Sequence, residues 1–219
     1  MTNQQTIAKP ARNAQQLALA GVVQGRPQRV PGRKRTVRPK PAPSFAPHAC
    51  VILAIDPGRV SGWAILERGV LVVLDGRPAV GSLRDDDARG RSSVVELAMS
   101  RAASVGLPLM VVAEKWLMHG MSHDSFAGLA ASWGRWDDTL ASWHVARSHV
   151  VRVYTQTWRA RVLGGRNEAG GTPWKDRARA WAQHAHGVDV GPDEAEAIAI
   201  GAWGARAGEV LEKMPRGRG

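Results

Sequence analysis

Short apolar runs alternate with longer helix-like stretches from residue 51 onward. Val51 to Asp56 and Leu109 to Glu114 are continuous apolar runs that end on an acid, which is typical of strands buried on both faces. Arg68-Gly69 predicts a two-residue hairpin turn. Further strands are predicted over 62–66, 70–74 and 150–154. The chain therefore has five predicted strands.

The helical pattern falls mainly after the first three strands. Helices are predicted over 92–105, 122–146, 156–163, 173–186 and 192–207. Ser92 or Ser93 is the expected cap of the first helix, residues 75–90 are expected to form a charged loop, and residues 164–172 a Gly-rich loop. Hairpins followed by strand–helix alternation predict an α/β fold, with a mixed five-stranded sheet flanked by helices.

The expected topology brings two acids together. Two-residue hairpins are expected to join the first three strands, so that strand 51–56 and strand 109–114 are central and parallel. Asp56 and Glu114 then lie side by side at one edge of the sheet. Asp193 and Glu196, three residues apart at the start of the last helix, project from one face. Carboxylates gathered at buried positions need a compensating charge, so the pattern predicts a divalent metal site.

The positive charge is concentrated in the first 48 residues. The chain of 219 residues has a net charge of +11, and residues 1–48 hold nine of its 30 Lys and Arg but no Asp or Glu. With its many prolines, this segment is predicted to be a disordered basic tail. A DNA-binding arm, a solubilising tail and an organelle transit peptide all fit this composition. A domain over 49–208 and a basic C-terminal tail over 209–219 are predicted to follow.

Cysteine content and hydropathy constrain the compartment. The only cysteine, Cys50, cannot form an intramolecular disulfide, which fits a reducing, cytoplasm-like compartment. No apolar run approaches the roughly 18 to 20 residues of a membrane span. We therefore expect a cytoplasmic protein, with organelle import as the alternative.

Three motifs resemble those of RuvC-type Holliday junction resolvases. Residues 52–58, Ile-Leu-Ala-Ile-Asp-Pro-Gly, followed by Ser61-Gly62-Trp63-Ala64, resemble the first motif of that family. Residues 111–115 resemble the second motif, with Lys115 where the family usually has Gln. Residues 192–200 resemble the last motif, with Glu196 where the family usually has Asp. A Gly-rich loop before a helix that carries Lys175 is also similar. The resemblance covers residues 50 to 208. The long basic tail suits a phage-type member, so the resemblance implies a bacterial or phage-infected cell.

The resemblance implies an RNase H-like fold, a homodimer and symmetric nicking of four-way DNA junctions. It also implies Mg²⁺, with Mn²⁺ able to substitute, because all the candidate ligands supply hard oxygen atoms. Two ions per site are expected, with Asp56 bridging them, Glu114 on one ion, and Asp193 and Glu196 on the other.

The same resemblance suggests DNA contacts around these acids. Lys175 is expected to stabilise the scissile phosphate, and Lys115 and Arg166 are further phosphate candidates. Leu117, or the larger Trp116, is the expected apolar wedge at the junction centre. Packing beneath the loop is the alternative for both.

Two other functions remain open at this stage. A different RNase H-like nuclease would cut RNA–DNA hybrids or flaps, and a non-catalytic junction-binding scaffold would use the same fold without cutting. Trp133, Trp136 and Trp143 recur on one side of the long predicted helix, where a core or dimer interface and DNA stacking are both possible.

Overall fold

The computed structural model describes residues 48–116, 122–164 and 173–207, all of which belong to one compact unit, residues 41–219. Its strands are β1 (Val51–Asp56), β2 (Val60–Glu67), β3 (Val70–Leu71), β4 (Val73–Leu74), β5 (Arg77–Pro78), β6 (Val80–Arg84), β7 (Leu109–Lys115) and β8 (Val150–Tyr154). Its helices are α1 (Ala88–Val105), α2 (His123–Ser142), α3 (Thr155–Trp158), α4 (Trp174–His186) and α5 (Pro192–Gly204), with the short helical turns η1 (Arg147–His149) and η2 (Arg159–Leu163).

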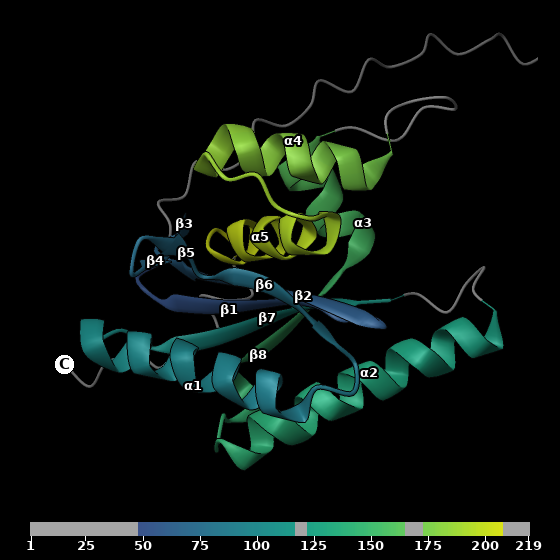
Figure 1. The fold of residues 1–219 in the computed structure, drawn as a ribbon, viewed down its shortest axis with the longest axis horizontal. Coiled ribbons are helices and arrows are strands. Elements are labelled where there is room, and N and C mark those ends of the chain that lie inside the picture. Colours follow the sequence, from purple (N-terminus) through teal and green to yellow (C-terminus); the bar gives the residue numbers. More distant parts are fainter. Residues whose placement is uncertain (1–47, 117–121, 165–172, 208–219) are drawn as a thin grey trace, which may run out of the picture. The chain divides into compact units, whose positions relative to one another are not determined.

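The main sheet has the predicted mixed architecture. Its strands run in the order β3-β2-β1-β7-β8, and β6 pairs with the same strand as β3, namely β2 (Figure 1). Strand β1 is antiparallel to β2 and parallel to β7, and β7 is parallel to β8. The predicted fold class, an α/β fold with a mixed sheet flanked by helices, is confirmed, and β6 adds a sixth strand to the five on the main path. The central parallel pair of β1 and β7 is confirmed with it.

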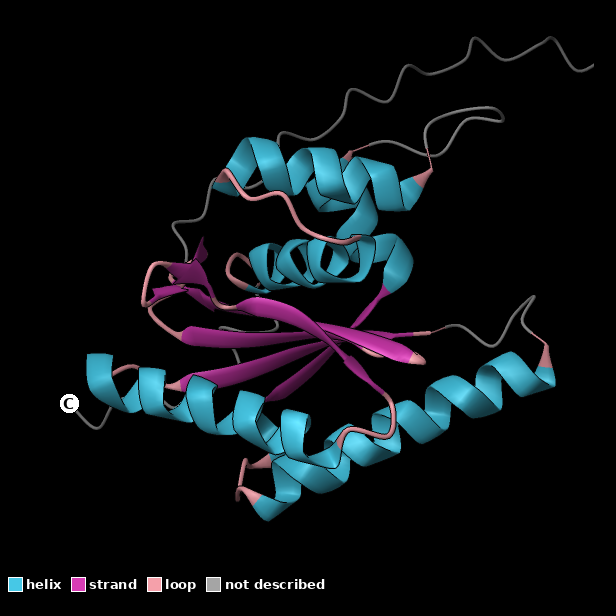
Figure 2. Ribbon diagram, viewed as in Figure 1, coloured by secondary structure: helices cyan, strands magenta, loops and turns pink. Residues whose placement is uncertain are grey.

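Helices cover both faces of this sheet (Figures 1 and 2). On one face, α5 packs directly on the strands and α4 packs on the outer side of α5. Helix α5 is buried along most of its length because it lies between the sheet and α4, and its apolar residues extend all around it. On the other face, α1 and α2 cover Val51, Leu53 and Ile55. Trp133 and Trp136 of α2 are buried in this second core, which favours the core interpretation for both.

The helix α5 approaches the sheet unusually closely at three glycines. A Cβ atom added to Gly201 would lie 2.3 Å from Leu66, and one added to Gly204 would lie 2.7 Å from Val112. A Cβ atom on Gly62 of β2 would lie 2.0 Å from the carbonyl oxygen of Asp193. Gly62 therefore lets the first turn of α5 rest against the backbone of β2, and Gly201 and Gly204 let its last turns pack against side chains of the sheet.

The prediction of a charged loop over residues 75–90 was wrong. These residues contain β5, β6 and the start of α1, and β6 pairs with β2 along its first five residues. Pairing with β2 determines the conformation of this segment, because its own alternation of apolar and polar residues is weak. Helix α1 begins after Asp87, which accepts a 2.8 Å hydrogen bond from the backbone N–H of Gly90, and not at Ser92 or Ser93.

Other differences concern the ends of elements. A three-residue connection, 57–59, replaces the two-residue hairpin expected between the first two strands, and Ser132 of α2 donates a 3.0 Å hydrogen bond to the carbonyl of Gly58 in it. The hairpin at Arg68-Gly69 is present, with positive φ at both residues. The predicted strand 70–74 is split into β3 and β4, and α2 ends at Ser142.

Some predictions lie outside the described residues. These are the disordered tail, the C-terminal tail, Leu117 and Arg166, so the domain boundaries at 48/49 and 208/209 stay predictions. Within the part of the chain that the structure describes, no helix combines the length and hydropathy needed to cross a bilayer.

Candidate metal centre

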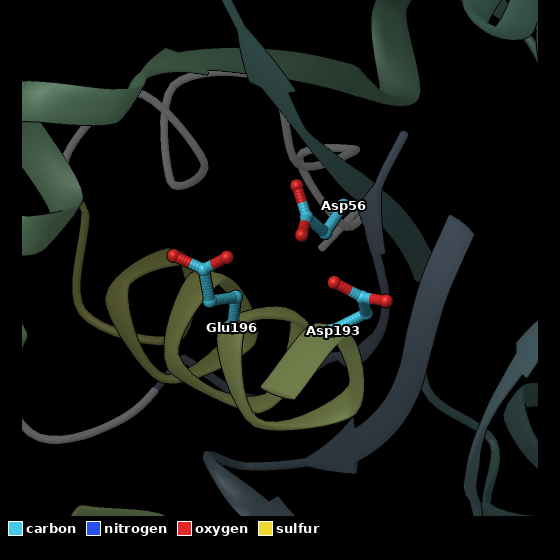
Figure 3. A group of neighbouring side chains, drawn as sticks. All are labelled: Asp56, Asp193 and Glu196. Atoms are coloured by element: carbon cyan, nitrogen blue, oxygen red, sulfur yellow. The ribbon is translucent and has the colours of Figure 1, made fainter. Parts of the chain in front are cut away.

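Three carboxylates from two elements meet at one end of the sheet. Asp56 is the last residue of β1, and Asp193 and Glu196 lie in the first turns of α5. One oxygen atom from each of the three lies within 4.8 Å of the other two, and the side chains point toward one another (Figure 3). The predicted convergence of these residues is therefore present in the fold.

The backbone of β2 sets the position of this cluster. Asp56 is directly opposite Gly62 in the antiparallel ladder, so both positions face the same side of the sheet, toward α5. Because Gly62 has no side chain, the backbone of Asp193 lies directly over it. The Asp56–Gly62 pair thus brings the end of β1 and the start of α5 together.

Glu114 lies in the same pocket but is held by different contacts. It is buried on β7, where Thr155 donates a 2.6 Å hydrogen bond to its Oε1 atom and Trp158 donates a 2.8 Å hydrogen bond to its Oε2 atom. Burial raises the pKa of Glu114, while these hydrogen bonds and Arg159 lower it and Glu196 raises it. Glu114 is therefore oriented by α3, which follows the neighbouring strand β8.

Two cations neutralise the acids of α5. Arg159 donates a 2.6 Å hydrogen bond to Glu196, and Lys175 donates a 2.7 Å hydrogen bond to Asp193. The hydrogen bond to Asp193 is the main reason that the pKa of Lys175 is raised. The guanidinium of Arg159 also lies 5.2 Å from the ring centre of Trp158 and 5.6 Å from that of Trp174. Lys175 therefore lies at the site, and its contact with the scissile phosphate stays a prediction.

Sequence reasoning missed Arg159. It lies in η2, a π-helical turn inside the segment that was predicted only as a short helix. The available signal was a basic residue directly after Trp158, in the first helix after a strand. That signal is weak, because most arginines at such positions face solvent.

Asp56 has the least favourable environment of the four acids. Burial raises the pKa of Asp56 well above its ordinary value, and Glu114, Glu196 and Asp193 raise it further, while Arg159 lowers it. Among the described residues, no side chain donates a hydrogen bond to its carboxylate. A cation between Asp56 and the acids of α5 would relieve this repulsion.

The cluster opens into a cavity of about 550 Å³. Trp116 lies at the cavity wall, next to Glu114, whereas Lys115 points to the opposite face of the sheet and lies over the ring of Tyr154. The cavity is lined by Asp56, Pro57, Glu114, Trp116, Leu129, Thr155, Gln156, Arg159, Trp174 and Glu196. The mixture of acids, cations and aromatic rings suits a charged, partly planar substrate.

The donor set fits Mg²⁺ or Mn²⁺. All the ligand atoms available from Asp56, Asp193 and Glu196 are carboxylate oxygens, which these hard ions prefer. Burial and the neighbouring acids raise the pKa of Asp56, so a divalent cation beside its carboxylate would be favourable. Glu114 lines the same cavity and could complete the set.

Comparisons with known proteins gave the following results. No protein-family model matches the chain, and no curated protein matches it. Among solved structures, RuvC of T. thermophilus in complex with a Holliday junction substrate is 15% identical over 70% of this chain and 90% of that one, with a TM-score of 0.44. A second Thermus thermophilus RuvC structure is 16% identical over 69% of this chain and 91% of that one, with a TM-score of 0.43.

Proposed function

We propose that the chain is a divalent-metal-dependent endodeoxyribonuclease that resolves four-way DNA junctions by paired symmetric nicks. The observation that carries the proposal is the meeting of Asp56, Asp193 and Glu196 within 4.8 Å, beside a cavity that Asp56, Glu196 and Glu114 line. Such a cluster is costly to fold unless it binds a cation. The three motifs that resemble RuvC-type resolvases supply these four acids, and they support a phosphodiester as the substrate.

The reaction is hydrolysis of one phosphodiester bond at each nick. The oxygen of a water molecule forms a bond to phosphorus, and the bond from phosphorus to the 3′ oxygen breaks, which leaves 5′-phosphate and 3′-hydroxyl ends. Divalent ions bound at such a site lower the pKa of the attacking water and neutralise the charge on the leaving oxygen. Asp56, Asp193, Glu196 and Glu114 would hold them.

The chain's own residues prepare this site in three ways. Gly62 lets α5 approach, so that Asp193 and Glu196 face Asp56. Thr155 and Trp158 fix both oxygens of Glu114. Lys175 and Arg159 pair with Asp193 and Glu196, and we expect them to balance the negative charge of a phosphodiester that enters the cavity.

Substitution of Asp56 tests this proposal. We expect Asp56→Asn to abolish cleavage of a four-way junction in Mg²⁺ or Mn²⁺ while junction binding in chelator is retained. Arg68→Gln, an exposed change in the turn at the opposite end of the sheet, is the control and should cut normally. Intact cleavage by Asp56→Asn would overturn the assignment.

Homodimer formation belongs to the same proposal. Symmetric cleavage of a four-way junction needs two active sites related by a two-fold axis. Sedimentation of the full chain with and without a junction measures this directly, and a chain that stays monomeric on the junction would contradict paired nicking.

A further inference from the structure

A second group of basic and aromatic residues lies along β8 on the opposite face of the sheet. We call Lys115, Arg147, Arg152 and Tyr154 the cationic patch. Lys115 on β7 is directly opposite Tyr154 on β8, and Arg152 lies two residues earlier on β8. Alternation along the strands directs these three side chains away from α5, whereas Glu114 points toward it.

Aromatic rings hold two of these cations in place. The guanidinium of Arg152 lies 4.0 Å from the ring centre of Trp133 on α2, and the ammonium of Lys115 lies 4.9 Å from that of Tyr154. Contacts of this kind fix the position of a cation without neutralising it. The hydrogen-bond donors of both side chains therefore stay available to an anion.

The patch carries more positive charge than its acid can balance. Asp137 lies 3.8 Å from Arg147, whose side chain is 94% exposed, so this ion pair is weak. Within the described part of the chain, no carboxylate lies within ion-pair distance of Lys115 or Arg152. Partial burial lowers the pKa of Arg152, Asp137 raises it and Arg147 lowers it again. The two arginines are thus close enough to repel each other, a repulsion that a bound anion would relieve.

The patch lies on the other side of the sheet from the carboxylate cavity, and two pairs of chain neighbours connect them. Lys115 follows Glu114, and Tyr154 precedes Thr155, which donates a hydrogen bond to Glu114. The patch surrounds a hollow of about 460 Å³ that is open to solvent. An extended polyanion in the carboxylate cavity could therefore continue around the ends of β7 and β8 to reach Arg152 and Arg147.

We propose that the cationic patch binds the sugar-phosphate backbone of a duplex DNA arm that leaves the catalytic cavity. The proposal rests on the proposed nuclease function. Two arginines and a lysine suit phosphate oxygens, and they would position an arm without reading its sequence. The competing explanation is that the charged residues of β8, which is an edge strand of the sheet, only prevent edge-to-edge aggregation.

The test is the salt dependence of DNA binding by the full chain in chelator, where no cleavage occurs. Fluorescence anisotropy with a labelled four-way junction compares wild type with the double variant Arg147→Gln/Arg152→Gln. Each lost phosphate contact should reduce the slope of log affinity against log salt by about 0.9, so the double variant should lose about 1.8. Its affinity at low salt should fall by about ten-fold or more.

The matched control is Arg68→Gln/Arg77→Gln. It removes the same charge from exposed positions at the sheet end opposite Asp56, so its slope should stay close to that of wild type. Equal slopes and affinities for the two double variants would overturn the proposal and favour the aggregation explanation. Because Arg152 packs on Trp133, the melting temperature of the double variant is measured too. The single variant Arg147→Gln changes an exposed side chain, and its slope of log affinity against log salt should still fall by about 0.9.

This experiment is separable from the nuclease assay. The patch is supported and the proposed function overturned if the double variant has a smaller salt slope of DNA binding while the wild-type chain cuts no DNA with Mg²⁺ or Mn²⁺. The patch alone is overturned if the wild-type chain cuts junctions while the double variant keeps the wild-type salt slope of DNA binding.

Discussion

Replacing Asp56 with asparagine should stabilise the metal-free protein. Burial and three neighbouring acids raise the pKa of Asp56 well above its ordinary value near 3.8, so the folded state binds this proton more tightly than the unfolded chain does. Stability is therefore lost as pH rises from that ordinary value toward the raised one. Asparagine removes the charge and keeps the shape, so the variant escapes this loss.

The magnitude follows from the geometry of the cluster. Charges 4.8 Å apart repel by about 3.5 kcal/mol at an effective dielectric constant of about 20, and by about 0.9 kcal/mol in bulk water. Asp56 has two such neighbours, but Arg159 and Lys175 neutralise much of their field. We expect a net gain of about 1 to 2 kcal/mol, which is about 2 to 8 °C in melting temperature for a domain of this size.

Thermal unfolding of wild type and Asp56→Asn, with chelator and with Mg²⁺ or Mn²⁺, measures this effect. In chelator at pH 8 the variant should melt above wild type, and its advantage should shrink at pH 5. Metal at 100 times its dissociation constant should stabilise wild type by about 2.7 kcal/mol and the variant much less. The difference between the two melting temperatures should therefore become smaller, or change sign, when metal is added.

Two results would refute this reasoning. If Asp56→Asn melts below wild type in chelator, Asp56 is a stabilising residue and the repulsion argument is wrong. If metal raises both melting temperatures equally, the ion binds elsewhere on the chain.

Three further predictions concern the surroundings of the acids. Thr155→Val removes a hydrogen bond that lowers the pKa of Glu114, so the acid limb of the pH–rate profile of junction cleavage should move to higher pH; an unchanged limb would mean that Glu114 does not titrate in the reaction. Gly62→Ala forces the start of α5 away and should cost about 1 to 3 kcal/mol of stability and most of the calorimetric Mn²⁺ binding, whereas Gly128→Ala, with open space around it, should bind Mn²⁺ normally; normal binding by both would remove Gly62 from the argument. Arg159→Gln leaves Glu196 without its partner, so calorimetry should show tighter Mn²⁺ binding even as cleavage falls; weaker Mn²⁺ binding would show that Arg159 instead orients Glu196 as a ligand.

Apolar runs and spaced acids carried most of the information that the sequence held about this fold. The continuous apolar strands ending on Asp56 and Glu114 were visible because burial on both faces leaves no polar alternation. Strand β6 was not visible, since Gly81 and the charges near it have no strand-like pattern and pairing with β2 decides their conformation.

The candidate site was predictable only in part for a similar reason. Asp193 and Glu196 are three residues apart on a helix, so their shared face follows from helical geometry. The contacts of Glu114 with Trp158, and of Glu196 with Arg159, join elements that local sequence cannot relate. Such contacts depend on the crossing of α3 and η2 over the sheet end, which only the folded chain shows.

The central claim is tested most directly by incubating the full chain with an end-labelled mobile four-way junction. Linear duplex, flap and RNA–DNA hybrid are assayed beside it, each with Mg²⁺, Mn²⁺ or chelator. The account predicts paired nicks at symmetric positions on the junction alone, with 5′-phosphate and 3′-hydroxyl ends, lost in chelator. Junction binding without cutting in either metal would contradict it and indicate a scaffold, and selective cutting of the hybrid or flap would indicate a different nuclease.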